Sequence, residues 1–289
     1  MQSRIMNNKN DDALLDVNGE SGFTLIELSI VLVIIGLIVG GILVGQDLIK
    51  AAEIRATVGQ IEKYNASVNT FRTKYNAIPG DITSANATAF GLFSETTLAG
   101  GAGHQDGNGL LEGGSAAATV PIGETLSFWR HLSDANLIDG NFGNSANAAL
   151  VVTTGVVTST VTVPNQTLPP TKTTPTNSFV VYSASGINYF QIIPVQTITT
   201  SAYTYNTVGL TPIQAYNMDI KLDDGMPVTG IVLAKAITSI NGNPSAQAAT
   251  TAAYCLMGDA VGTATTDTYN RVPATGGNDG SCALRFRFN

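Results

Sequence analysis

Residues 22–45 read GFTLIELSIVLVIIGLIVGGILVG, and this stretch decides the fold. From Leu28 to Gly45 it contains no ionisable side chain, so as a helix it is long enough to span a bilayer. Its one charge, Glu27, lies just inside the apolar run. A carboxylate there costs roughly 2–3 kcal/mol or more in lipid, depending on depth, and usually needs a partner. The stretch therefore predicts a membrane helix with one acid that requires a cation.

A candidate cleavage site supplies that cation. Gly22 is small and directly precedes Phe23, and a cut between them would give Phe23 a free α-amino group. The sequence from Gly22 to Leu28, GFTLIEL, resembles the processing motif of type IV pilins and of the pseudopilins of type II secretion. The resemblance implies that a prepilin peptidase cuts after Gly22 and methylates Phe23. It also implies that Glu27 compensates the amine of a neighbouring subunit.

Two other interpretations of the N-terminus are weighed against this one. An uncleaved signal anchor would make the chain a membrane-anchored adhesin or receptor domain. A cleavable secretory signal fits worse, because the run is too long and no small-x-small site follows it. The leader, residues 1–22, has a formal net charge of −2 from two basic and four acidic side chains, whereas the resemblance implies a basic leader. Orientation is therefore taken from the motif, with Met6 as an alternative start.

Composition favours an exported, membrane-anchored protein without nucleic-acid partners. Charged residues make up 12% of the chain, against about a quarter in ordinary globular proteins. The net charge of −7 gives no global electrostatic footprint for nucleic acid. With two histidines, no Cys-His pairing, no GxSxG elbow and no phosphate-binding loop, the sequence predicts no enzyme.

One long helix is expected at the N-terminus, because no proline occurs before Pro79. Apolar residues continue past the membrane run, mostly at three- or four-residue steps, as an amphipathic helix requires: Ile54, Ile61, Tyr64, Val68, Phe71 and Tyr75. The expected organisation is a leader at 1–22, a transmembrane segment at 23–45, the amphipathic half of the same helix at 46–77, and a head at 78–289.

The head is expected to be α+β. Residues 124–137 predict a second helix that buries Trp129 and neighbouring leucines and leaves Arg130 and His131 at a solvated edge. From Leu150 onward β-branched and aromatic runs predict strands, at 151–163, 179–182, 189–193 and 231–233. The resemblance implies a pilin-like fold: a long N-terminal transmembrane and amphipathic helix packed on an antiparallel β-sheet head, with long loops.

Three later segments complete the expectations for the head. Residues 164–176 are rich in proline and threonine and predict a surface loop. Residues 215–230 resemble a late-sheet segment of the same family, with a tight turn at Asp223-Asp224-Gly225 that could instead bind a cation. Cys255 and Cys282, the only cysteines, predict one disulfide in an exported chain, closing a C-terminal loop.

One loop is a candidate calcium site. Asp106, Asn108 and Glu112 place oxygen-bearing side chains around a glycine-containing turn, as calcium prefers. The EF-hand pattern is incomplete, and a plain glycine turn is the alternative. No other cofactor is expected.

The sequence thus predicts a structural subunit of a type IV pilus or type II secretion pseudopilus. Residues 23–289 make a chain larger than most major pilins, which favours a minor pilin or a larger pseudopilin. Expected partners are the prepilin peptidase, other pilin or pseudopilin subunits, and an inner-membrane assembly platform. The precursor is expected in the bacterial inner membrane with its head in the periplasm, and the mature subunit in a surface pilus or periplasmic pseudopilus.

Overall fold

The computed structural model describes ten stretches of the chain: residues 22–94, 105–113, 123–142, 164–174, 176–198, 203–205, 209–236, 255–257, 268–271 and 282–288. The predicted strands at 151–163 and nearly all of the predicted leader lie outside these residues. The long helix α1, Leu25–Tyr75, confirms the predicted N-terminal helix. It crosses the boundary between two compact units, Met1–Leu48 and Ile49–Asn289, which are described separately. The second is called the head unit below.

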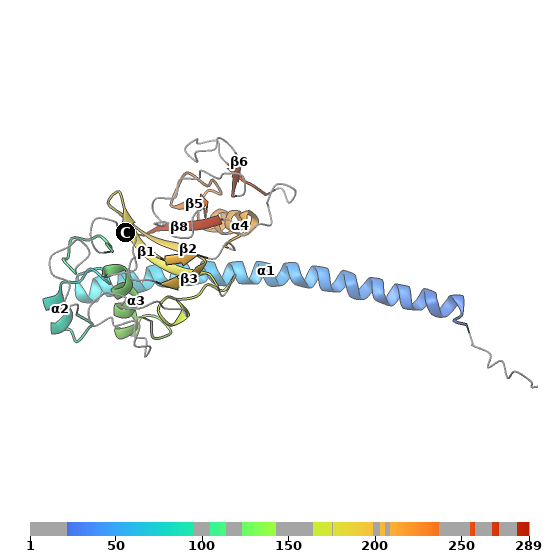
Figure 1. Cartoon of the computed structure of the whole chain (residues 1–289), viewed down its shortest axis with the longest axis horizontal. Helices are drawn as coiled ribbons and strands as arrows, with labels where there is room; N and C mark the ends of the chain where they lie inside the picture. The colour runs from blue at the N-terminus through green and yellow to red at the C-terminus, as the bar shows by residue number, and fades with distance from the viewer. Residues whose placement is uncertain are drawn as a thin grey trace, which may run out of the picture. The chain divides into compact units, whose positions relative to one another are not determined.

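The head unit combines three further helices, one 3₁₀ turn and eight strands within the described residues (Figure 1). The helical elements are α2 (Ser84–Ala89), α3 (Glu124–Asp134), the 3₁₀ turn Pro164–Gln166, and α4 (Pro212–Leu222). The strands are β1 (Ser178–Ala184), β2 (Ile187–Ile193), β3 (Val195–Ile198), β4 (Tyr203–Tyr205), β5 (Val232–Ala236), β6 (Leu256–Met257), β7 (Thr268–Tyr269) and β8 (Cys282–Phe288).

The central sheet is antiparallel and has the strand order β1-β2-β8-β5, which confirms the predicted α+β class. β1 and β2 form a hairpin through Ser185 and Gly186, both with positive φ, the conformation that a two-residue turn between twisted strands needs. β8 then inserts between β2 and β5, so the end of the chain lies in the middle of the sheet.

Both edges of this sheet are covered. On β1, the Phe179 N–H donates to the Pro169 carbonyl and the Ser183 N–H to the Leu111 carbonyl. On β5, the Ala234 N–H donates to the Pro227 carbonyl. Because unpaired edges invite pairing with other chains, this coverage limits uncontrolled strand addition.

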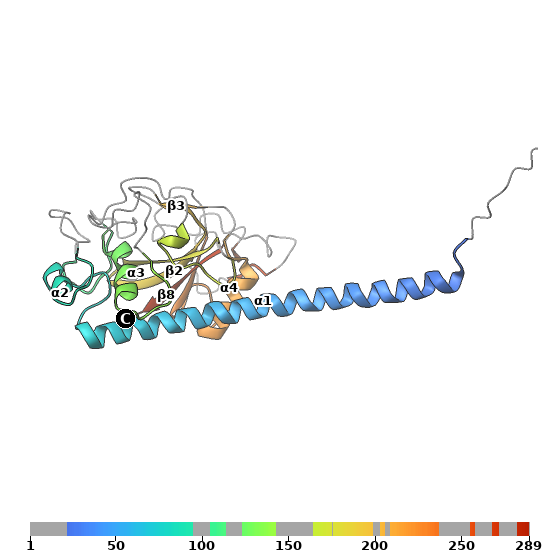
Figure 2. The same cartoon turned by 90° about the horizontal axis from the view of Figure 1, so that it is seen from below.

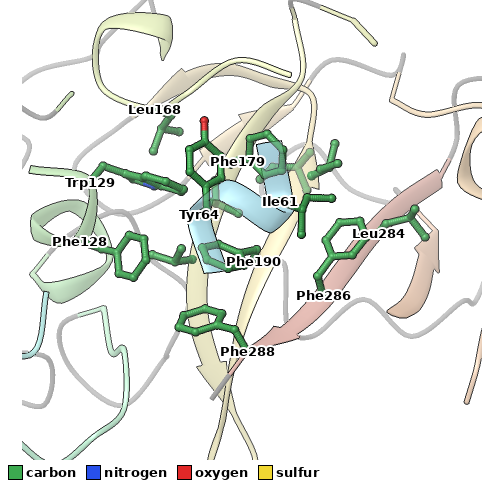
Figure 3. Packing of buried hydrophobic residues seen from close by; sticks show 14 of the residues in the cluster. Ile61, Tyr64, Phe128, Trp129, Leu168, Phe179, Phe190, Leu284, Phe286 and Phe288 are labelled. Atoms are coloured by element: carbon green, nitrogen blue, oxygen red, sulfur yellow. The ribbon is translucent and has the colours of Figure 1, made fainter. Parts of the chain in front are cut away.

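Residues 49–75 of α1 lie along the sheet, with α3 beside them (Figure 2). Tyr64 is at the centre of the core, where its ring meets the rings of Trp129 and Phe179 edge-on at centroid distances of 5.0 and 5.2 Å (Figure 3). Edge-to-face aromatic pairs contribute about 0.5–1.5 kcal/mol beyond their buried area. The predicted apolar stripe of the amphipathic half is buried in full: Ile54, Ile61, Tyr64, Val68, Phe71 and Tyr75.

Two expectations about the head are wrong. Residues 215–230 are not part of a sheet, because α4 occupies Pro212–Leu222. Thr211 forms a capping box with Gln214, and Pro212 is at the first turn; both favour a helix start.

The second wrong expectation is the surface loop at residues 164–176, the proline- and threonine-rich segment. It packs against α1, and Leu168, Thr171 and Thr173 are buried. Two polar groups of this segment are paired: the Thr173 N–H donates to Thr57 Oγ1, and Thr171 Oγ1 donates to the Thr174 carbonyl.

Candidate functional site

The N-terminal segment forms a capping box at the start of α1. Residues 22–24 are not helical, and α1 begins at Leu25. The Thr24 N–H and Oγ1 both donate to Glu27 Oε2, at 2.7 and 2.8 Å, and the Glu27 N–H donates back to Thr24 Oγ1 at 3.3 Å. This reciprocal pairing satisfies donors that a helix start otherwise leaves open, so Glu27 fixes where the helix begins.

The second carboxylate oxygen of Glu27 is available. Oε2 receives both bonds from Thr24, and Oε1 has no hydrogen-bond partner within residues 22–94 or the other described stretches. The surrounding side chains are apolar and exposed, with Phe23 at 83% and Leu28 at 50%. A free carboxylate oxygen in apolar surroundings is a binding position for a cation.

The first half of α1 exposes apolar side chains on all of its faces. Every large hydrophobic residue from Phe23 to Ile49 is exposed, and Glu27 is the sole acid between Phe23 and Asp47. A helix that is hydrophobic all round must be covered by lipid or by other helices. In the described part of the chain, α1 is the one helix that is long and apolar enough to cross a membrane.

Comparison with protein families gives a match at this same segment. Residues 17–43 match the prokaryotic N-terminal methylation motif. The chain carries the type IV pilin and pseudopilin signature. No curated protein and no solved structure gave a match.

This signature supports a coarse description of the class of proteins that carry it. Proteins that carry it are structural rather than enzymatic, assemble with other pilin subunits and are processed by a prepilin peptidase. The apolar helix and the motif together are consistent with membrane anchoring. The roles of Gly22, Phe23 and Glu27 stay predictions.

A second group of functional side chains lies in the head unit. Asp81, Asp106 and Glu124 each offer a carboxylate oxygen within 4.8 Å of the others. Asp81 follows the end of α1, Glu124 begins α3, and Asp106 lies on the segment 105–113. Gly80 allows the approach: its φ is +92°, and a Cβ there would lie 2.5 Å from the Glu124 carbonyl oxygen.

The structure brings the three calcium candidates together only in part. Asn108 Nδ2 donates to Asp106 Oδ2 at 3.0 Å and to Glu112 Oε2 at 3.4 Å. Asp106 alone joins the carboxylate cluster, whose other members, Asp81 and Glu124, are buried and were not predicted. Calcium binding stays a prediction.

Burial changes the proton affinity of this region. It raises the pKa of Asp81 to about 6 and that of Glu124 to about 9, because a buried carboxylate loses its hydration. The backbone N–H groups that donate to each carboxylate lower its pKa, but burial has the larger effect. Neighbouring carboxylates, Asp106 among them, add to the upward shift. Both shifts favour the protonated form of these two carboxyl groups.

His131 corrects a prediction, since it is fully buried rather than at a solvated edge. Its Nδ1 accepts from the Gly80 N–H at 2.8 Å, and its Nε2 donates to the Phe93 carbonyl at 2.7 Å. With both nitrogens paired, the neutral ring can be buried, and burial lowers its pKa to about 4. The neighbouring Arg130 is partly exposed and pairs with Asp134 at 2.8 Å.

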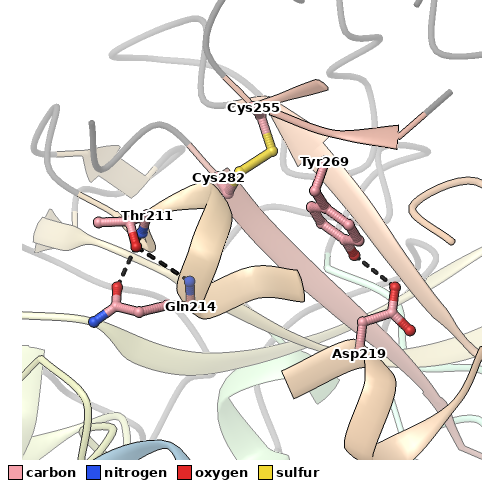
Figure 4. The surroundings of a disulfide bond; sticks show 6 residues. All are labelled: Thr211, Gln214, Asp219, Cys255, Tyr269 and Cys282. Carbon is pink, nitrogen blue, oxygen red and sulfur yellow. Dashed lines mark hydrogen bonds between the residues drawn. A yellow bond between two sulfur atoms is a disulfide. The ribbon is translucent and has the colours of Figure 1, made fainter. Parts of the chain in front are cut away.

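The predicted disulfide is present and joins Cys255, beside β6, to Cys282 on β8 (Figure 4). Close to it, the buried Tyr269 hydroxyl donates to Asp219 Oδ2 at 2.7 Å. Asp219 forms a second acidic group with Asp223 and Asp224, the two acids of the predicted turn. Asp219 accepts hydrogen bonds from the Tyr269 hydroxyl and from the Gly225 N–H, so its burial has a structural explanation.

Proposed function

We propose that the chain is a prepilin, a structural subunit of a type IV pilus or type II secretion pseudopilus. A prepilin peptidase cuts it between Gly22 and Phe23 and methylates the new Phe23 amine. The mature subunit then packs through the apolar half of α1 into a filament, where Glu27 pairs with the amine of a neighbouring subunit.

The observation that carries this proposal is the free Oε1 of Glu27 in the first turn of α1, at the start of an uncovered apolar surface. Covering that surface with lipid or with other helices removes water from the carboxylate, and an unpaired acid at such depth costs roughly 2–3 kcal/mol or more. A cationic amine at Oε1 offsets this cost only in the correct register. The proposed pairing therefore selects one relative position of adjacent subunits.

Within this class we propose a minor pilin or a larger pseudopilin, because of the size of residues 23–289. The precursor would be a single-pass protein of the bacterial inner membrane with its head in the periplasm. An inner-membrane assembly platform would then move the mature subunit into a surface pilus or a periplasmic pseudopilus.

The test is intact-mass measurement and N-terminal sequencing of the protein recovered from native membranes. We expect a chain that starts at methylated Phe23, and an uncut chain in cells that lack the prepilin peptidase. An intact leader in cells with an active peptidase would overturn the proposal and favour the anchored adhesin or receptor domain instead.

A further inference from the structure

One dipeptide of the head unit has a chemically labile sequence. The chain contains three Asn-Gly pairs, at positions 18–19, 108–109 and 241–242, and Asn108-Gly109 is the pair that lies within the described residues. In such a pair the glycine nitrogen can attack the asparagine side chain, because glycine has no Cβ to hinder the approach. Asn108 is exposed to water. Gly109 has a φ of +88°, a conformation that favours glycine, so the fold requires the labile residue at this position.

Deamidation of this pair would proceed through a cyclic imide. The Gly109 nitrogen loses its proton to solvent base and attacks Asn108 Cγ; the N–Cγ bond forms, the Cγ–Nδ2 bond breaks, and ammonia leaves with a proton from solvent. Water then opens the ring at either carbonyl, which gives aspartate or isoaspartate at position 108. The first step therefore needs a free Gly109 N–H and a main chain that can bring this nitrogen to Cγ.

The folded chain holds Gly109 by both of its backbone polar groups. The Gly109 N–H donates to Asp81 Oδ2 at 2.7 Å, and the Gly109 carbonyl accepts from Asn188 Nδ2 at 2.9 Å. Asp81 follows the end of α1, Asn188 lies on β2, and both residues are buried. A hydrogen bond to a carboxylate keeps the proton on the nitrogen and is among the stronger hydrogen bonds in proteins. The Gly109 N–H is therefore not free to react.

Residues on either side of the pair are anchored as well. Before it, the Gly107 N–H donates to the other oxygen of Asp81 at 2.8 Å. After it, Leu111 is fully buried, its N–H donates to Asn188 Oδ1 at 2.9 Å, and its carbonyl accepts from the Ser183 N–H at 2.8 Å. Because the chain is anchored before and after the pair, the glycine nitrogen cannot move to the asparagine side chain without breaking several of these bonds.

The Asn108 side chain has partners that deamidation would remove. Its Oδ1 accepts from the Leu110 N–H at 2.7 Å, and its Nδ2 donates to Asp106 Oδ2 and Glu112 Oε2, at 3.0 and 3.4 Å. Both products lack the Nδ2 donor and place a further carboxyl group beside these two acids. Isoaspartate also adds one carbon atom to the main chain. Because ammonia is lost, the change is permanent.

We propose that Asn108-Gly109 is a conditional modification site, which Asp81 keeps intact in the folded protein. While the Gly109 N–H is bonded to Asp81, residue 108 stays asparagine. When that bond is released, by local opening of the segment 105–113 or by removal of the Asp81 side chain, Asn108 converts to aspartate and isoaspartate. The modified fraction thus records how long this part of the head unit has been open.

The rate of deamidation at Asn108 tests this proposal. The full-length chain in detergent micelles is incubated at neutral pH with EDTA to remove divalent ions, and peptides covering 105–113 are followed by mass spectrometry. We expect the native wild type to deamidate about tenfold or more slowly than the same protein unfolded in guanidinium chloride. Equal rates in the native and unfolded wild type would overturn the proposal, and this comparison needs no variant.

Variants test the role of Asp81 itself. Asp81→Ala removes the acceptor and should raise the native rate by about tenfold or more, since hydrogen bonds to charged groups are the strong ones. Asp81→Asn leaves one oxygen for two N–H groups, should give a smaller increase, and provides the readout if Asp81→Ala does not fold. Glu112→Gln, the matched control, removes an acid that contacts Asn108 but not Gly109, and should stay within about twofold of the wild type. No increase in the folded Asp81 variants, or an equal increase in Glu112→Gln, would overturn the proposal.

Discussion

Glu27 has two separable properties, a hydrogen-bond acceptor that caps α1 and a negative charge. Glu27→Gln keeps the first, because glutamine also serves at this position of a capping box, and removes the second. We expect the variant to be cleaved like the wild type but to be absent from filaments sheared off cells. The measurement is immunoblotting of membrane and sheared fractions, together with intact mass.

Asp47→Asn is the matched control for this prediction. It removes the next acid along α1, which lies beyond the apolar run. Filament incorporation of Asp47→Asn should be close to that of the wild type. Normal incorporation of Glu27→Gln would show that the charge is not needed for assembly.

His131 is expected to matter for stability rather than for chemistry. His131→Leu leaves the buried Gly80 N–H and the partly buried Phe93 carbonyl without partners, and each unpaired group costs about 1–3 kcal/mol. The free energy of unfolding should therefore fall by about 2–5 kcal/mol. Urea unfolding followed by the fluorescence of Trp129, the single tryptophan, measures it.

The adjacent residue gives the comparison. Arg130→Ala breaks a partly exposed ion pair with Asp134, and such pairs contribute about 1 kcal/mol or less. If His131→Leu were no more destabilising than Arg130→Ala, the two hydrogen bonds of the imidazole would not be important for the fold.

At the scale of elements, the disulfide links the short β6–β7 pair to the central strand β8. The two cysteines are 27 positions apart, and in the chain-entropy model a closed loop of that size stabilises by about 3–4 kcal/mol. The double substitution of Cys255 and Cys282 by alanine should lower the free energy of unfolding by a similar amount.

A reducing agent supplies the control for this element. Unfolding of the wild type in dithiothreitol should approach that of the double variant, whose own unfolding should not respond to the reagent. Identical unfolding curves of oxidised wild type and double variant would contradict the prediction.

At the scale of the whole molecule, stability should fall as pH rises above neutrality. Glu124 has a folded-state pKa of about 9, against about 4.3 for glutamate in an unfolded chain. The folded protein therefore binds more protons between these values, and its advantage is lost as pH rises through about 9. The pKa values of Asp81 and Asp219 are both raised to about 6, so these two acids also lower stability as pH rises, but over a lower pH range.

His131 acts in the opposite sense below neutrality, since its folded-state pKa of about 4 lies below the ordinary 6.5. Stability from this residue is lost as pH falls from about 6.5 through about 4.

Because the pKa of Glu124 is raised, the urea midpoint should decrease between about pH 7 and pH 9.5, and Glu124→Gln should flatten that decrease. A midpoint that rises with pH in this range would contradict the assignment.

Local sequence patterns predicted those helices and strands whose formation depends on residues close together in the chain. The apolar run and the later stripe predicted α1 to within two residues at each end, and the aromatic runs predicted β1 and β2. The signal for α4 is also local, in the cap formed by Thr211, Pro212 and Gln214. The same holds for the capping box of Thr24 and Glu27.

Features that depend on distant residues could not be predicted. Whether His131 is buried depends on Gly80 and Phe93, which are 51 and 38 positions away. The carboxylate cluster joins a turn, a segment and a helix start that no spacing rule connects. Local sequence patterns do not specify which long-range partners meet.

The capping box at Thr24 has a consequence for the proposed cleavage. Proteolytic enzymes act on extended peptide bonds, and a helix that continued backwards through Phe23 would hide the scissile amide inside its hydrogen-bonded ladder. Thr24 and Glu27 end the ladder one residue after that dipeptide, so Gly22 and Phe23 keep non-helical backbone next to a rigid apolar helix. The residue expected to align neighbouring subunits would thus also present each precursor's own cutting point to the enzyme.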